Sequence, residues 1–218
     1  MLKGSFIPSL DIREFRDLVS YRKKVVGQIA SEKNRIIKIL EDANIKLSNV
    51  LSNVDRAVGT KIINDLKNGE TSLDKLMLHY HGKQKASRDE FRKALEGNIT
   101  EHHKLMLSIH KENISNKENQ LKHLDEVIDK AREAYQVEID LLQNIPGVGK
   151  DSAVSIISET GVDMSRFPYE THLSSWSGMS PGNCEIGGKK KRTVHGNKHL
   201  QSALVECGWE PPEKKIVI

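Results

Sequence analysis

The chain is poor in cysteine and lacks long apolar runs. Its two cysteines, Cys184 and Cys207, lie far apart without CxxC spacing, so the sequence indicates neither a zinc site nor a disulfide framework. No apolar run approaches the length that crosses a bilayer, and the start of the chain lacks the apolar segment of a signal peptide. We therefore expect a soluble protein of a reducing cytoplasm, with no membrane partner.

Aromatic residues are also scarce, at 5% of the 218 residues, whereas charged residues make up 29%. This composition predicts an extended, helix-rich protein with modest cores. The formal charge of +4 is mildly basic and by itself a weak argument for nucleic acid. Basic residues gather at 22–24 and again at 189–192, and a solvated face is the alternative explanation for either run.

The most informative stretch is residues 142–161, which predict two helices joined by a tight turn. Pro146 ends the first helix, Gly147 and Gly149 flank Val148 in the turn, and Gly161 ends the second helix as a C-cap. Such a helix-hairpin-helix presents the free amides of a helix start, which together with Lys150 can bind a phosphate group.

A second interpretation of this hairpin remains open, since some hairpins of this shape pack only against protein. The turn carries no group that reads base edges. Any nucleic-acid contact would therefore be independent of sequence and made to the backbone.

Apolar periodicity predicts further helices along the chain. One covers residues 11–42, a polar stretch interrupts it at 43–53, and others fall near 58–66, 73–77, 91–95 and 198–205. Between them, apolar residues recur every seven positions with Leu124 and Ala131 in the accompanying slots: Leu107, Ile114, Leu121, Ile128, Tyr135 and Leu142. This seam predicts an intramolecular helix hairpin, a dimer contact or simply an amphipathic core helix.

Four histidines fall on the seam helix, at His102, His103, His110 and His123. They show neither an HxxxH spacing nor a carboxylate frame that would convert them into a metal site. We expect all four at the surface.

Several separated motifs occur together: GSFIP at 4–8, YRKK at 21–24, EDANIKL at 41–47, IPGVG at 145–149, SWSGMSPGN, GGKKK and HGNKHL. In this combination and order the chain resembles the DEDD-type insertion-sequence transposases, the IS-one-ten-like family of RNA-bridged recombinases. The likeness covers residues 1 to about 209.

The resemblance implies an N-terminal RuvC-like domain with four metal-binding carboxylates, then a coiled coil that helps assemble the subunits. A C-terminal transposase domain with a nucleophilic serine follows, and the helix-hairpin-helix opens it. In this family, donor and target DNA are joined while held by a structured noncoding RNA. For this chain we expect a mainly α fold: a helical region at 1–98, a coiled-coil helix at 99–142, a transposase domain at 143–209 and an irregular tail at 210–218.

The chain departs from the family pattern at both chemical sites. The acidic domain of the family lies ahead of the segment that matches GSFIP, so we expect no cofactor in this chain, Mg²⁺ belonging only to the missing domain. Ile186 stands where the family presents its serine, and an isoleucine has no oxygen to attack a phosphodiester. The nearest hydroxyls, on Ser180 and Thr193, have no specified general base.

We therefore expect a nucleic-acid-binding fragment of a transposase without catalytic activity of its own. Its partners would be DNA, a structured noncoding RNA and further copies through the coiled coil, in a prokaryotic cytoplasm and on the nucleoid when bound. The alternatives are a module that regulates or joins full-length transposase, and a recombinase subunit complemented in trans. The candidate binding residues are Gly147, Val148, Gly149, Lys150, Lys189, Lys190, Lys191, Arg192 and Lys198.

Overall fold

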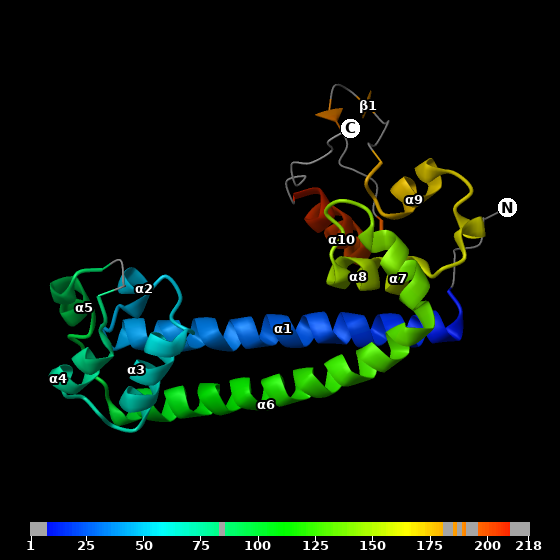
Figure 1. Cartoon of the computed structure of the whole chain (residues 1–218). Coiled ribbons are helices and arrows are strands. Elements are labelled where there is room, and N and C mark those ends of the chain that lie inside the picture. The colour runs from blue at the N-terminus through cyan, green and yellow to red at the C-terminus, as the bar shows by residue number, and fades with distance from the viewer. Residues whose placement is uncertain (1–7, 83–85, 181–184, 187–188, 191–195, 210–218) are drawn as a thin grey trace. The chain divides into compact units, whose positions relative to one another are not determined.

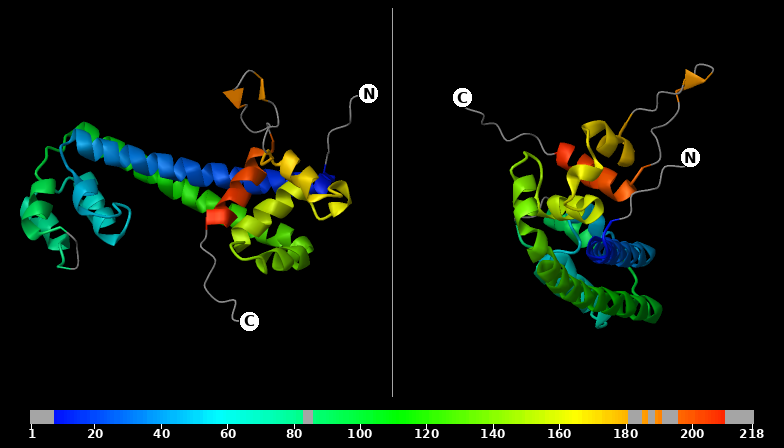
Figure 2. Two further views of the ribbon diagram at one scale, coloured as in Figure 1. Left: turned by 90° about the horizontal axis from the view of Figure 1, so that it is seen from above. Right: turned by 90° about the vertical axis from the view of Figure 1, so that its right-hand side faces the viewer.

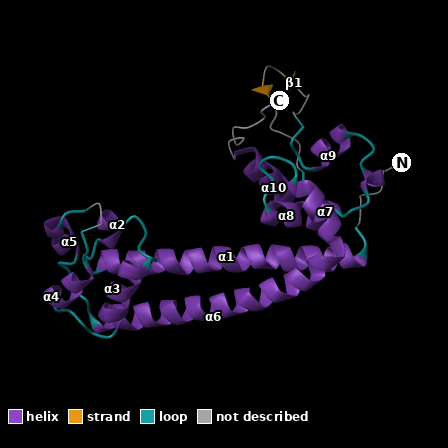
Figure 3. Ribbon diagram, in the orientation of Figure 1, coloured by secondary structure: helices purple, strands orange, loops and turns teal. Residues whose placement is uncertain are grey.

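The computed structural model describes residues 8–82, 86–180, 185–186, 189–190 and 196–209, and helices dominate it (Figure 3). The elements are labelled in Figure 1, and they confirm the predicted mainly α class. The chain forms two compact units. Residues 23–123 form the central unit, and residues 1–22 with 124–218 form the terminal unit.

Two long helices contribute to both units. Helix α1 (Leu10–Asp42) matches the predicted helix at 11–42, and α6 (Glu101–Arg132) carries most of the heptad seam. In the central unit they run antiparallel, since Lys117 Nζ donates to Gln28 Oε1 at 2.9 Å while His103 Nε2 lies 2.9 Å from Asp42 Oδ2. The seam is thus covered within the chain, as an intramolecular hairpin.

Short helices complete the central unit. They are α2 (Leu47–Val50), α3 (Ala57–Lys67), α4 (Leu73–Leu76), the 3-10 turn η1 (Met77–His79) and α5 (Arg88–Ala94). The predicted interruption after residue 42 is confirmed, although α2 adds one helical turn inside it. Fully buried side chains, including Ile62, Leu66 and Phe91, pack these elements together.

Two of the four histidines predicted at the surface are buried, so that expectation was wrong for them. His103 and His110 are only 9% and 8% exposed, and each pairs with a carboxylate of α1, Asp42 and Glu32 respectively. The heptad spacing of a single helix shows its apolar face but not the acids on the helix that covers it. A buried histidine requires such a partner.

In the terminal unit, α6 ends at Arg132, whereas the heptad seam runs on to Leu142. The 3-10 turn η2 (Glu133–Tyr135) separates it from α7 (Gln136–Gln143). The ring of Tyr135 packs on that of Phe15, with centroids 5.5 Å apart. The last apolar positions of the seam therefore enter the core of the terminal unit rather than the hairpin.

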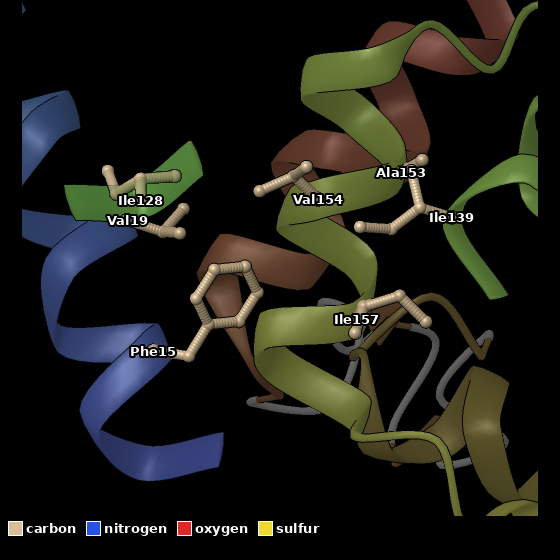
Figure 4. Close-up of a cluster of buried hydrophobic side chains, with 7 residues drawn as sticks. All are labelled: Phe15, Val19, Ile128, Ile139, Ala153, Val154 and Ile157. Atoms are coloured by element: carbon tan, nitrogen blue, oxygen red, sulfur yellow. The ribbon is translucent and has the colours of Figure 1, made fainter. Parts of the chain in front are cut away.

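Helix α8 (Lys150–Thr160) lies at the centre of the terminal unit, where every residue from 153 to 160 is buried. One side of its core contains, as Figure 4 shows, Phe15 and Val19 from α1, Ile128 from α6, Ile139 from α7, and Ala153, Val154 and Ile157 from α8 itself. On another side, Ile156 packs against Leu200 and Ala203 of α10 (Lys198–Trp209), which lies beside α8 (Figure 2). The helix predicted at 198–205 is confirmed.

The rest of the terminal unit connects α8 to α10. It contains the turn η3 (Met164–Arg166), α9 (Glu170–Trp176) and two short antiparallel strands, β1 (Glu185–Ile186) and β2 (Lys189–Lys190). Leu173 and Trp176 of α9 pack against the α8 and α10 cluster. The predicted tail at 210–218 lies outside the described residues.

Candidate nucleic-acid interface

A turn joins α7 and α8 at the position of the predicted hairpin. After α7 the amide of Ile145 donates to Leu142 O, and that of Val148 donates to Ile145 O, each at 3.0 Å. Gly147 has a φ of +84°, a left-handed conformation that favours glycine. At the far end of α8, Gly161 has a φ of +72° and its amide donates to Ile157 O at 2.8 Å, which confirms the predicted C-cap.

The two glycines of this turn meet different surroundings. A Cβ on Gly147 would lie 2.3 Å from the carbonyl oxygen of Cys207 in α10, so this glycine allows α10 to approach the turn. A Cβ on Gly149 would meet no atom within 4 Å. The space beside Gly149 is therefore open, while the space beside Gly147 is filled by α10.

The start of α8 leaves its first amides without a side-chain cap. Gly149 is the N-cap residue, with extended backbone angles, and it has no side chain to accept a hydrogen bond. Gly149, Lys150 and Asp151 are all exposed. The free amides and the positive end of the helix dipole favour the binding of an anion here, and Lys150 adds positive charge. Asp151 in the first turn carries a negative charge and disfavours the binding of an anion.

Val148 has a packing role. It is half-buried and contacts the core on both sides of α8, the cluster around Ile139 and Phe15 and the cluster around Leu200. This contact holds the turn against the core and so fixes the direction in which the α8 amides point.

The basic residues predicted for the same site lie on other elements or outside the described residues. Lys189 and Lys190 form β2, paired with Ile186 and Glu185, whereas Lys191 and Arg192 lie outside the described residues. Lys198 is exposed at the first residue of α10.

Helical geometry separates Lys198 from the turn. Gly147 contacts α10 at Cys207, and by helical rise Lys198 is about 14 Å further along that helix. Lys198 is thus not brought next to the start of α8.

Sequence reasoning missed Asn197, which ties three helices together. Its Nδ2 donates to Glu159 Oε2 of α8 at 2.6 Å, and its backbone amide donates to Trp176 O of α9 at 2.9 Å. Its Oδ1 accepts the amides of His199 and Leu200 at 3.0 and 3.1 Å, which caps α10. An asparagine directly before an apolar helical pattern is a cap signal that could have identified it.

A close backbone crossing adjoins this residue. A Cβ on Gly196 would lie 2.1 Å from the amide nitrogen of Gly178, so the chain before α10 passes directly over the end of α9. Ser177 and Gly178 of the SWSG motif therefore meet Gly196 at this crossing, which gives these parts of the resembling motifs a structural role.

The position expected to hold a nucleophile is in β1. Ile186 pairs through its backbone with Lys189, and the sequence offers no hydroxyl there. Ser180 Oγ lies 2.9 Å from Ser174 Oγ, and among the described residues no side chain that could act as a base hydrogen-bonds to this pair. Thr193 lies outside the described residues.

The described residues were also compared with the requirements of a membrane-spanning helix and of a metal site. Within the described ranges, no helix combines the length and apolar character needed to cross a membrane. The described residues also contain no group of three or more His, Cys, Asp or Glu side chains placed to hold a metal ion. Asp11 and Asp17, the acids nearest the GSFIP motif, are exposed on α1 and belong to no such group.

Comparison with known proteins places the hairpin in a family domain. Residues 139–211 match the model of the Transposase IS116/IS110/IS902 family, a range that begins in α7 and includes the turn, α8, α9 and α10. Neither the curated proteins nor the solved structures gave a match to the chain. The domain at residues 139–211 is therefore similar to the IS110-like transposase family.

Proposed function

We propose that this transposase-family protein binds the phosphate backbone of nucleic acid through the turn between α7 and α8, acting as a helix-hairpin-helix. The observation that supports the proposal most directly is the open, uncapped start of α8 inside the family-matched range. Backbone amides and a lysine bind phosphate without reading bases. The interaction is therefore expected to be strong at low salt and insensitive to sequence.

The packing around the turn supports this proposal because it gives the amides a fixed direction. Gly147 lies against α10 and Val148 lies in the core, so the turn is held from two sides. Groups that are already ordered lose little conformational entropy on binding. The basic residues at 189–192 would add charge without sequence preference.

We also propose that the chain carries out no serine-based recombination by itself and requires no metal to bind. Ile186 cannot form a phosphoserine-type intermediate, and Ser180 is engaged with Ser174. Neither the hairpin amides nor Lys150 needs a cation to attract phosphate. Affinity in excess EDTA should equal affinity without it.

A salt titration tests the binding proposal. Fluorescence anisotropy of a labelled DNA duplex and of a labelled single-stranded RNA, each measured with the full chain over a range of salt, should give log K falling linearly with log salt. Two unrelated DNA sequences should give the same affinity. Absence of binding to every probe at the lowest salt would reject the proposal.

A second candidate function is co-assembly with a transposase subunit of the same family, including a second copy of this chain. The observation that favours it is a row of exposed apolar residues at four-residue spacing on α7 and just after it: Val137, Leu141 and Ile145, which are 70%, 63% and 52% exposed. Such a row of exposed apolar side chains, two on one face of α7 and one just after it, is typical of a protein contact. The heptad seam of α6 is already covered by α1 and is less suited to this purpose.

Light scattering distinguishes this candidate from simple nucleic-acid binding. The parent should sediment and scatter as an oligomer, and Leu141→Ser, which adds no charge, should return it to a monomer while leaving DNA affinity unchanged. Leu121→Glu, on the covered seam, should instead reduce folding stability. A monomeric parent at high concentration, alone and with a full-length relative, would exclude co-assembly.

A further inference from the structure

The basic charge of this protein is not in the unit that contains the family-matched domain. The central unit has 19 Lys and Arg against 13 Asp and Glu, a net charge of +6. The terminal unit has 15 against 17, a net charge of −2. The long-range attraction that a polyanion feels therefore comes from the central unit.

A groove of about 610 Å³ opens on the central unit, between α5 and the segment that contains α2. Lys46 lines it from the wall that contains α2, together with the polar side chains of Ser48, Asn49 and Ser52, and Lys93 lines it from α5. The two walls are joined by the amide of Lys46, which donates to Ala94 O at 2.9 Å. The groove is thus a built feature with a cation on each side.

Both lysines are available to a ligand. Nearby charges are paired, Lys75 with Glu70 and Arg92 with Asp74, but among the described residues no carboxylate pairs with Lys46 or Lys93. The two ammonium groups and the neighbouring hydroxyl and amide donors are a set that proteins use to contact phosphate, and the charge of Lys93 also acts on Glu90.

The one acid in the lining does not cancel this charge. Glu90 Oε2 accepts both the amide and the hydroxyl of Ser87, each at 2.8 Å, and closes the capping box of α5. These two hydrogen bonds, with a smaller contribution from the charge of Lys93, outweigh desolvation and lower the pKa of Glu90, so the carboxylate is charged and directed to the start of its own helix. One acid against two lysines leaves the groove positive.

We propose that the groove between Lys46 and Lys93 binds the phosphodiester backbone of a nucleic acid, as a second contact distinct from the start of α8. The inference rests on the proposed function and extends it, because the groove would bind the same class of ligand at a site in the central unit. The described residues that line the groove include no aromatic side chain on which a base could stack, so the contact is made to phosphates. Single-stranded RNA and duplex DNA share this chemistry.

The test compares two double variants of the full chain with the same change in charge. Lys46→Glu with Lys93→Glu reverses the groove, and Lys38→Glu with Lys122→Glu reverses two exposed lysines elsewhere in the same unit. Anisotropy against a labelled single-stranded RNA and a labelled DNA duplex is measured over a salt series. Circular dichroism verifies that all variants are folded, and Lys46→Gln with Lys93→Gln serves as a milder pair.

The groove variant should bind the preferred probe at least ten-fold more weakly. Its plot of log K against log salt should be shallower, by about 1.4 for single strands or about 1.8 for duplex DNA, as expected for two lost phosphate contacts. The control should lose less affinity and keep its slope. If the groove variant loses more affinity for one probe than for the other, that probe shows whether the groove binds the phosphates of RNA or of DNA.

Equal affinity of the groove variant and the parent would overturn the inference, and so would equal losses in the groove and control variants. A Lys150→Glu variant measured in parallel separates this result from the proposed function. Loss only in Lys150→Glu supports the hairpin and rejects the groove, whereas loss only in the groove variant supports the groove and rejects the hairpin. Absence of parent binding to either probe rejects both.

Discussion

His110 Nδ1 lies 2.6 Å from Glu32 Oε2 in the interior of the central-unit hairpin, where both side chains are buried. His110 occupies a position of α6 that the heptad pattern assigns to an apolar residue. The pair joins the two long helices by a charged contact within an apolar seam. Such a contact specifies which faces of the helices meet, at the cost of burying a carboxylate.

Removing one member of this pair should destabilise the fold more than removing both. His110→Leu leaves the Glu32 carboxylate buried with only Asn113 and Arg35 nearby, and we expect a loss of about 2–4 kcal/mol in the free energy of unfolding. Glu32→Leu combined with His110→Leu should recover at least half of that loss. Urea unfolding followed by circular dichroism measures all three proteins, and additive losses in the double variant would contradict the prediction.

The same pair predicts a dependence of stability on pH. Burial opposes charge on Glu32, but hydrogen bonds from His110 and Asn113 and the charge of Arg35 outweigh it and hold the pKa of Glu32 below its ordinary value of 4.5. A carboxyl group whose pKa is lowered by folding stabilises the protein above its unfolded pKa and loses that effect as pH falls through the folded pKa.

The parent should therefore exceed Glu32→Gln in free energy of unfolding by a constant amount above about pH 5.5. The difference should shrink progressively below about pH 4.5. Urea titrations of both proteins at several pH values measure it. A difference that grows on acidification would show that the sign is wrong.

Gly147 and Gly149 should respond oppositely to substitution. Gly147→Ala places a Cβ against Cys207 O in a left-handed backbone conformation, so we expect a loss of about 1–3 kcal/mol in stability. Gly149→Ser meets open space and can cap α8 with its hydroxyl, so stability should be kept or raised. Thermal unfolding measures both.

Gly149→Ser should nevertheless weaken nucleic-acid binding several-fold, because its hydroxyl occupies an amide that the phosphate requires. No charge changes in this variant, so electrostatic repulsion cannot explain a loss. Fluorescence anisotropy at fixed salt measures the affinity of the variant for nucleic acid. Unchanged affinity in a stably folded variant would show that the turn has only a structural role.

The charges at the start of α8 should act in opposite directions on affinity. Lys150→Gln should bind DNA more weakly and reduce the salt slope by about 0.9, the amount for one phosphate contact. Asp151→Asn should bind more tightly, since an exposed acid in the first turn repels phosphate. Probes of unrelated sequence should show the same changes, because neither side chain reads bases.

Asn197 should be more important for stability than its exposure suggests. Asn197→Ala removes the cap of α10 and the hydrogen bond to the buried carboxylate of Glu159, with an expected loss of about 2–4 kcal/mol. Asn197→Asp keeps the cap but sets two carboxylates against each other, and adding Glu159→Gln should restore a donor between them. Failure of the second change to rescue stability would mean that the contact contributes little.

Much of the local structure could be predicted because its causes are local. The helix at 11–42, the break after it and the helix at 198–205 follow from apolar periodicity, and the turn before α8 follows from Pro146 and two glycines. Gly161 was identified as a C-cap for the same reason. The end of α6 at Arg132 was missed, because the seven-residue spacing continues past it while the chain changes direction.

The sequence by itself determined the mainly α class, the apolar seam and the turn, since each depends on residues within a few positions of one another. Only the tertiary structure decided what covers each surface. In the structure α1 covers the apolar seam and Glu32 pairs with His110. The structure also shows that Gly147 packs against α10 whereas Gly149 faces open space. Periodicity states which face of a helix is apolar, but the neighbour of that face comes from segments far away in the chain, where no local pattern specifies the contact.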